Sequence, residues 1–440
     1  MEIMEKTTIE KLRAKKGVVV HAWVDTIRDQ KAMIFVVLRD RSGKVQMVVK
    51  KDSQPEIAKS FEGLQVNSTV IVKGDVVEAP QVKLGGIEII PTSVEVTSHA
   101  KVSPIDAESS VDLLMDYRWI DLREDKKRAI FEVMTVVASA LRDFSVENGF
   151  IEVMTPKLTG NSSEGGSEVF EVKYFEQKAY LTQSPQLYKQ MAIAAGFEKY
   201  FEFTPIFRAE NSHTNRHATE AFVFDMEIAW IDSHHEILDL KEKLFPYVQK
   251  QVEKKCGILI KKYFGIDFKA QTAPIPRVTL LDSYELLRKE RNYEIPRAKK
   301  GDLDPEGERL LCEIAKEKWN SDFIFITDYP AAARAFYSQR HTEGKFGELN
   351  LSKSFDLLYK GVEITSGAKR EHVPAKLRDN LRFKGINPDD LEFYTQFFEY
   401  GCPPHGGFSL GLARFVAKML DLPSIRDATF LFRGPDRLAP

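Results

Sequence analysis

Charged side chains cluster between Phe207 and Glu220, a stretch that contains two arginines, two histidines and two glutamates. The flanking runs, 201–207 and 221–224, are apolar and predict two strands joined by a charged loop. Arg208 lies within the first apolar run, and a guanidinium buried there needs a carboxylate or phosphate partner. A polar hairpin loop is ordinarily a solvated turn, but this one predicts a site for an anion such as phosphate.

Two carboxylates, Asp356 and Glu363, lie on either side of Lys360-Gly361, which predicts a hairpin turn. The two strands of a hairpin can bring both carboxylates to one hard cation. Mg²⁺ binds one or two carboxylates together with phosphate oxygens. Charged hairpin residues are more often simply solvated, so the residues alone leave both interpretations open.

Length and composition limit the class of protein. A chain of 440 residues predicts two or three domains, and 43% hydrophobic with 29% charged residues is typical of a soluble globular protein. No apolar run reaches the roughly 18 residues of a membrane span, and the charged first residues are unlike a signal peptide, so we expect a cytoplasmic protein without membrane contact. Three widely spaced cysteines predict neither a zinc site nor a disulfide framework. The net charge of -2 disfavours indiscriminate coating of nucleic acid but permits a local basic face, for which residues 1–51 are the candidate.

The elements that must position these residues can be read from hydrophobic periodicity. Five short β-rich runs between Gly17 and about Glu95 predict a small barrel, with the OB-fold as the leading interpretation and an SH3-like barrel as the alternative. A helix is predicted from Arg123 to Asn148, ending at Asn148-Gly149, and a strand closed by Pro156 follows it. Residues 234–255 predict a second helix, and residues from roughly 260 to 345 alternate between helices and loops.

The motifs resemble those of the class II aminoacyl-tRNA synthetases. Arg208-x-Glu210, a loop and Arg216-His217 before a returning strand are similar to the second motif of this class, and residues 406–414 are similar to its third. The closest likeness is to aspartyl-tRNA synthetases of the archaeal and eukaryotic type, including the archaeal-like form found in some bacteria, and it covers essentially the whole chain.

This resemblance implies an α+β fold. An OB-fold β-barrel that binds the anticodon is expected at residues 1–98 and a linker at 99–115. Residues 116–440 are expected to form a class II catalytic domain, built on an antiparallel sheet flanked by helices, with an insertion at about 260–345. The helix and strand after Arg123 resemble the first motif, which implies a homodimer.

The resemblance also implies an activity. The enzyme would form aspartyl-adenylate from L-aspartate and ATP with Mg²⁺, and would then charge tRNA(Asp), with tRNA(Asn) open as a second substrate. Arg208, Glu210 and Arg414 are the expected catalytic residues. ATP would be bound by Arg208, Glu210, Arg216, His217, Glu363, Gly411 and Arg414, and Asp356 with Glu363 would hold the metal.

A further group of residues is expected to choose the amino acid. By resemblance, Lys189 in the run Thr182–Gln190 pairs with the side-chain carboxylate of aspartate, and Arg370 is the second cation. Two cations would repel an ammonium-bearing side chain and leave an amide poorly compensated, which favours aspartate over lysine and asparagine. The other expected aspartate-binding residues are Glu164 in a Gly-rich loop, Gln186, Asp225 and Ser366.

The resemblance extends to three positions that hold the anticodon in relatives, which are Arg28, Phe35 and Gln46 here. An exposed aromatic ring with flanking polar groups can stack on one base and form hydrogen bonds to the edge of that base. The alternative is that Phe35 belongs to the barrel core.

The chain departs from the family pattern at Ala413, at Ala221 and at Gly434. These departures concern adenine binding and keep open one alternative, a nucleotide- or tRNA-binding protein that has lost synthesis. The other alternative, an asparagine-specific or asparagine synthetase-like paralogue, is disfavoured by Lys189 and by the intact barrel.

Overall fold

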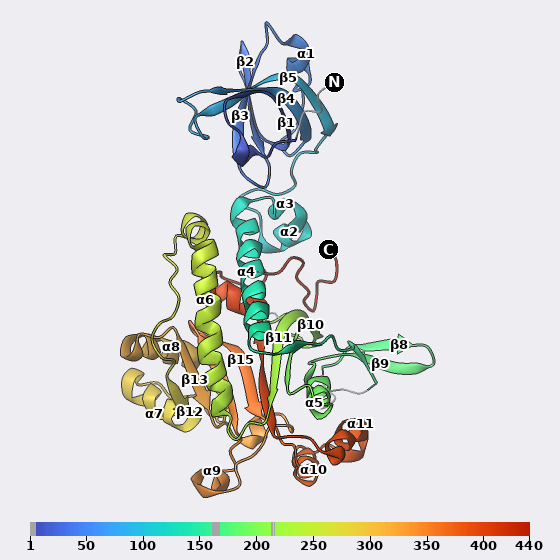
Figure 1. Cartoon of the computed structure of the whole chain (residues 1–440), viewed down its shortest axis with the longest axis vertical. Coiled ribbons are helices and arrows are strands. Elements are labelled where there is room, and N and C mark those ends of the chain that lie inside the picture. The colour runs from blue at the N-terminus through green and yellow to red at the C-terminus, as the bar shows by residue number, and fades with distance from the viewer. Residues whose placement is uncertain (1–5, 161–167, 213, 215) are drawn as a thin grey trace. The chain divides into compact units, whose positions relative to one another are not determined.

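The computed structural model describes residues 6–160, 168–212, 214 and 216–440, which divide into two compact units, Met1–Glu108 and Ser109–Pro440 (Figure 1). Each unit has a hydrophobic core of its own.

The first unit is a closed five-stranded barrel with the strand order β1-β2-β3-β5-β4, in which β4 returns to pair with β1. Its elements are β1 (Lys15–Asp29), β2 (Met33–Arg39), β3 (Lys44–Lys50), α1 (Pro55–Lys59), β4 (Thr69–Glu78) and β5 (Ile87–Ser98). Alternate side chains point inward, so that Ile34, Val36 and Leu38 of β2 are buried in the barrel core. A five-stranded barrel with a helix between β3 and β4 confirms the predicted OB-fold.

The second unit is built on an eight-stranded sheet with the order β12-β13-β14-β15-β16-β11-β10-β6. The strands are β6 (Ile151–Glu152), β10 (Lys199–Phe207), β11 (Glu220–Ala229), β12 (Arg277–Thr279), β13 (Phe323–Thr327), β14 (Ser354–Tyr359), β15 (Val362–Lys369) and β16 (His405–Gly411). Only the outermost pairs, β6 with β10 and β12 with β13, are parallel. The six central strands pair antiparallel, as predicted.

Two long helices, α4 (Asp125–Glu147) and α6 (His235–Phe264), lie side by side against the sheet (Figure 1). Ile130, Val133, Val137 and Leu141 of α4 recur at three- and four-residue spacing and are buried in the cluster that also contains Phe224 and Phe408 of the sheet. Helix α4 ends at Glu147 with Asn148 as its C-cap, and Gly149 adopts a positive φ of 78°, as the predicted end at Asn148-Gly149 requires.

The other helices complete the unit. They are α2 (Val111–Asp116), α3 (Arg118–Asp121), α5 (Gln186–Ala194), α7 (Leu280–Arg291), α8 (Pro305–Trp319), α9 (Gly344–Glu348), α10 (Pro374–Phe383), α11 (Glu392–Thr395) and α12 (Leu412–Met419). A separate three-stranded sheet consists of β7 (Leu158–Thr159), β8 (Glu171–Tyr174) and β9 (Gln177–Leu181).

The structure differs from the sequence prediction in three places. The strand expected up to Pro156 is divided between β6 and β7, because Pro156 lacks the N–H that a continuous ladder requires. Helix α6 extends beyond residue 255 and contains Pro246. The block 260–345 was predicted to alternate between helices and loops, but it also contains β12 and β13, which extend the main sheet.

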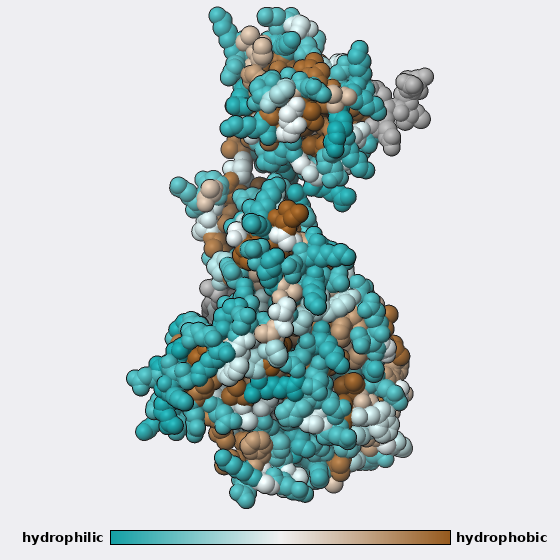
Figure 2. Space-filling model, turned by 60° about the vertical axis from the view of Figure 1, so that its left-hand side comes forward, coloured by the Kyte–Doolittle hydropathy of each residue, from teal (hydrophilic) through white to brown (hydrophobic). Residues whose placement is uncertain are grey.

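On the face shown in Figure 2, hydrophilic residues predominate and apolar residues form small separate groups. In the described part of the chain, no helix is both long and apolar enough to cross a membrane.

Candidate active site

The central sheet has two chemically different faces, because side chains alternate along each strand. On β11, Phe224 and Met226 belong to the core beneath α4 and α6, whereas Asp225 between them faces the other way. The same alternation places Ser409 of β16 and Asp356 of β14 opposite their apolar neighbours. The polar face of the sheet therefore carries the polar and ionisable side chains that could take part in binding or catalysis.

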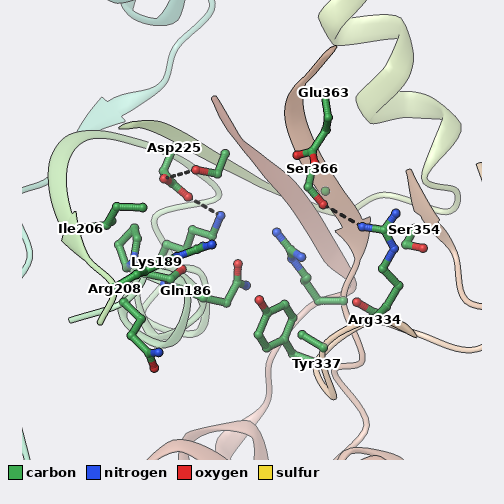
Figure 3. A pocket seen from close by; sticks show the side chains of 18 of the residues that line it. Gln186, Lys189, Ile206, Arg208, Asp225, Arg334, Tyr337, Ser354, Glu363 and Ser366 are labelled. Carbon is green, nitrogen blue, oxygen red and sulfur yellow. Dashed lines mark hydrogen bonds and ion pairs between the residues drawn. The ribbon is translucent and has the colours of Figure 1, made fainter. Parts of the chain in front are cut away.

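A cavity of about 460 Å³ opens over this polar face, bordered by α5, strands β11, β15 and β16, and the loop 333–338. Eight of the predicted site residues line it: Gln186, Lys189, Arg208, Glu210, Asp225, Glu363, Ser366 and Arg370. Figure 3 shows them in two groups, with Lys189, Asp225 and Arg208 on one side of the cavity and Glu363 and Ser366 on the other.

Lys189 belongs to a buried cluster of ion pairs. Its side chain is 1% exposed, and Nζ lies 2.7 Å from Oδ1 of Asp225 and 3.1 Å from Oε2 of Glu227. Arg370 donates two hydrogen bonds to Glu227, of 2.8 and 3.2 Å, and Ser409 donates one of 2.9 Å to Asp225. The structure thus brings together both cations that the sequence assigned to the aspartate side chain.

Glu227 belongs to this cluster but was not predicted. Burial alone would raise the pKa of Glu227, but Arg370 and Lys189 outweigh it and hold that pKa at about 2. It is therefore ionised at neutral pH, and the two cations face two protein carboxylates. Its position two residues after Asp225 on β11 was a usable signal, since residues i and i+2 of a strand share a face.

The premise that Arg208 is buried was wrong. Strand β10 ends at Phe207, so Arg208 follows the strand, and its side chain is 48% exposed with Glu210 3.6 Å away. A loose pair of this kind contributes little to stability. Arg208 nevertheless borders the cavity, where its guanidinium is accessible to an anion.

The predicted carboxylate hairpin is confirmed, with β14 and β15 joined through Lys360 and Gly361, both at positive φ. Arg334 donates to both oxygens of Asp356, at 3.0 and 2.5 Å, and to Oγ of Ser366 at 3.1 Å. Asp356 does not line the cavity, whereas Glu363 does. Arg334 belongs to the block 260–345, and no sequence motif near it indicated that it would pair with Asp356.

The donor set fits a hard cation. Burial raises the pKa of Glu363, and the like charge of Asp356 raises it further. A divalent ion would relieve that repulsion, and Mg²⁺ usually binds one or two carboxylates together with phosphate and water oxygens. Glu363 and Asp356 would hold the ion, with Arg334 competing for Asp356.

Arg216, His217, Gly411 and Arg414 do not line the main cavity. Arg414 donates to the backbone oxygen of Glu363 at 2.8 Å and to that of Arg216 at 3.2 Å, and both arginines border a second cavity of about 350 Å³. Burial lowers the pKa of His217, and the positive charge of Arg414 lowers it further. Gly411 is the last residue of β16, directly before α12.

Arg216 also pairs with a residue that was not predicted. Its Nη1 lies 3.0 Å from Oε2 of Glu308 on α8. Burial and the charge of Glu363 raise the pKa of Glu308 to about 7, although Arg216 opposes the shift. No sequence motif marked Glu308, because it lies far from the loop along the chain.

Glu164 lies outside the described residues. On the barrel, Phe35 is not in the core, because its neighbours Ile34 and Val36 point inward instead. Arg28 pairs with Phe35 across β1 and β2, and its guanidinium lies 5.8 Å from the ring centroid. Gln46, on the adjacent strand β3, donates to Glu88 at 3.3 Å.

Taken together, the helix-flanked antiparallel sheet, its cavity lined by cations and carboxylates, and the barrel define a class II synthetase architecture. Residues 110–433 match the family described as tRNA synthetases class II (D, K and N), and residues 18–97 match the OB-fold nucleic acid binding domain. The chain belongs to this family of class II tRNA synthetases, which are enzymes.

Individual relatives resemble the chain over nearly its whole length. It is 40% identical to an aspartate–tRNA(Asp) ligase of Pyrococcus horikoshii, with 98% of each chain covered. It is 38% identical to an aspartate–tRNA(Asp/Asn) ligase of Aeropyrum pernix, with 95% and 94% covered. Among solved structures, asparaginyl-tRNA synthetase of Pyrococcus horikoshii complexed with asparaginyl-adenylate superposes with a TM-score of 0.89 at 32% identity, covering 100% of both chains.

Proposed function

We propose that the chain is an aspartate–tRNA ligase, which activates L-aspartate with ATP and transfers it to the 3′ end of tRNA(Asp). The observation that carries this proposal is the buried pair of cations, Lys189 and Arg370, beside the cavity. A side-chain carboxylate can share these cations with Asp225 and Glu227, whereas an amide offers them no charge.

In the first step, an α-carboxylate oxygen of aspartate attacks the α-phosphorus of ATP in line, a new O–P bond forms, and the bond to the leaving pyrophosphate breaks. Arg208, accessible at the cavity edge, is the candidate for binding the α-phosphate and the carboxylate. Asp225 is the candidate partner of the α-ammonium. Arg216, His217 and Arg414 are the candidates for the terminal phosphates.

In the second step, the 3′-hydroxyl of the terminal adenosine attacks the carbonyl of the mixed anhydride, and AMP leaves. Glu210, which also borders the cavity, is the candidate for orienting the nucleotide or this adenosine. Mg²⁺, when bound by Asp356 and Glu363, would neutralise phosphate charge. Gln186 and Ser366 line the cavity on opposite sides and complete the proposed amino-acid site.

The barrel is proposed to bind the anticodon through Arg28, Phe35 and Gln46. The outward position of Phe35, with Arg28 beside it, supports stacking of one base. Some relatives are named as ligases for tRNA(Asp) alone and others as ligases for both tRNA(Asp) and tRNA(Asn). Whether this chain also charges tRNA(Asn) is therefore a question for experiment.

We further propose a homodimer. Exposed apolar residues gather beside the edge strand β6, where Met154 is 87% exposed and Ile151 and Leu158 are also exposed.

The proposed domains are the barrel at 1–98, a linker at 99–115 and the catalytic domain at 116–440. The proposed location is the cytoplasm, which suits the three free thiols.

The second candidate function is asparagine activation. The structural similarity to an asparaginyl-tRNA synthetase complexed with asparaginyl-adenylate suggests it, but the relatives named as aspartate–tRNA ligases and the paired cations oppose it. The family match opposes the other alternative, a protein without synthesis activity, although Ala221 and Ala413 depart from the family pattern at the proposed adenine site.

ATP–pyrophosphate exchange with aspartate and with asparagine in parallel distinguishes these functions. We expect exchange with aspartate and little with asparagine, followed by charging of tRNA(Asp). Exchange with asparagine alone would contradict the aspartate assignment, and exchange with neither, in folded protein, would contradict synthesis altogether. Charging assays on both tRNAs then decide whether tRNA(Asn) is also a substrate.

A further inference from the structure

Four residues from separate segments form a closed ring of contacts beside the cavity. Glu308 of α8 accepts a hydrogen bond from Arg216 at 3.0 Å, and the backbone oxygen of Arg216 accepts one from Arg414 at 3.2 Å. Arg414 also donates to the backbone oxygen of Glu363 at 2.8 Å, and the backbone N–H of Glu363 bonds to Glu308. The ring joins the charged loop, the third motif, the carboxylate hairpin and the block 260–345.

Glu308 is the member of this ring that can fix the geometry of Arg216. Helix α8 is anchored by Leu311, Ile314 and Ala315, which are buried against β13 and β14. Arg216, in contrast, lies in a loop between two strands and has no regular backbone pairing of its own. A carboxylate on a packed helix is therefore a rigid support for a long, flexible side chain in a loop.

The pair differs from the ion pairs on the outer face of the same helix. Glu308 is 14% exposed, whereas Glu306 and Glu313, which pair with Arg309, are each 46% exposed. Exposed pairs contribute little because water screens them, but a largely buried carboxylate leaves a substantial cost if its partner is lost.

We propose that Glu308 is a positioning residue, which holds the guanidinium of Arg216 so that its remaining N–H groups face the terminal phosphates of ATP. This inference rests on the proposed function. A guanidinium has five N–H donors in a fixed plane. One hydrogen bond to Glu308 therefore fixes the orientation of the plane and leaves the remaining N–H donors available for phosphate oxygens. Glu308 acts through Arg216 and does not touch the substrate.

The test compares Glu308→Ala and Glu308→Gln with wild type in ATP–pyrophosphate exchange. We expect Glu308→Ala to raise the KM for ATP about tenfold with little change in the KM for aspartate. Glu308→Gln, which can still accept from Arg216, should recover most of the affinity. Glu313→Ala on the outer face of α8 is the matched control and should behave as wild type. An unchanged or lower KM for ATP in Glu308→Ala would overturn the proposal.

A double-mutant cycle separates positioning from a general structural role. If Glu308 acts through Arg216, then Glu308→Ala should add nothing to the ATP defect of Arg216→Ala, whereas additive defects would overturn the proposal. ATP dissociation constants, measured by calorimetry without amino acid on variants with wild-type melting temperatures, give the same comparison independently of catalysis. Failure of exchange in wild type would remove the proposed function, while unchanged ATP binding in Glu308→Ala would remove this inference alone.

Discussion

At the scale of single residues, the charges around Lys189 balance without a ligand. Asp225 and Glu227 neutralise Lys189 and Arg370, and all four side chains are almost completely buried. Incoming aspartate must therefore share cations that already have partners. Its side-chain carboxylate is held by a preformed arrangement, which reduces the reorganisation needed on binding.

Replacing Lys189 by Met keeps an unbranched side chain, shorter by one atom, and removes one of the two cations. We expect aspartate-dependent exchange to fall about a hundredfold or more, because Asp225 and Glu227 lose half of their compensation and the substrate carboxylate loses a partner. ATP affinity should remain close to wild type. Exchange assays and ATP calorimetry measure the two effects.

Lys178→Met is the control for this substitution, because Lys178 lies on β9 with 73% of its side chain exposed. Melting curves of both variants show whether Lys189→Met remains folded. Full aspartate-dependent exchange in folded Lys189→Met would contradict the proposed role of the lysine.

At the scale of elements, the hairpins were predictable and their remote partners were not. The strands flanking residues 208–220 and the turn at Lys360-Gly361 follow from local alternation and turn residues, and both are confirmed. Arg334 and Glu308 reach the site from segments that are close to it only after folding. Local patterns contain no information about such contacts, so sequence reasoning missed both residues.

Two glycines, one inside α6 and one directly after it, give opposite expectations for stability. Gly257 lies inside the helix with no atom within 4 Å of an added Cβ, so Gly257→Ala should raise the free energy of unfolding by about 0.5–1 kcal/mol. Gly265 ends the helix at a φ of 73°, so Gly265→Ala should lower that free energy by about 1 kcal/mol.

Urea denaturation of the two glycine variants measures both changes against the same wild-type curve. Equal shifts in the same direction would contradict the assignment of Gly265 as a left-handed helix end.

At the scale of the whole molecule, the stability of the second unit should depend on pH through His405. Its Nδ1 donates to the backbone oxygen of Pro403 at 2.8 Å, and its Nε2 accepts from the amide of Gln190 at 2.9 Å. Burial lowers the pKa of His405 to about 4, although Glu227 opposes the shift. The folded state therefore holds the neutral ring, whereas the unfolded chain protonates near the usual value of about 6.5.

Because the folded pKa lies below the unfolded one, this contribution is complete above about pH 6.5 and is lost as the pH falls towards 4, by roughly 3 kcal/mol in all. His405→Gln should be less stable at neutral pH but should show a shallower loss of stability between these values. Denaturation curves across this pH range measure the slopes, and identical slopes in both proteins would contradict the prediction.

The order of strands in the sheet has a consequence for synthesis of the chain on the ribosome. Strand β16, at residues 405–411, separates β11 from β15, so the two halves of the sheet have no shared hydrogen bonds until this late segment has emerged. Until then both halves expose an unpaired strand edge, and such edges favour aggregation of nascent chains. Folding of this unit is thus expected to be completed only when residues 405–411 are available to pair with both edges.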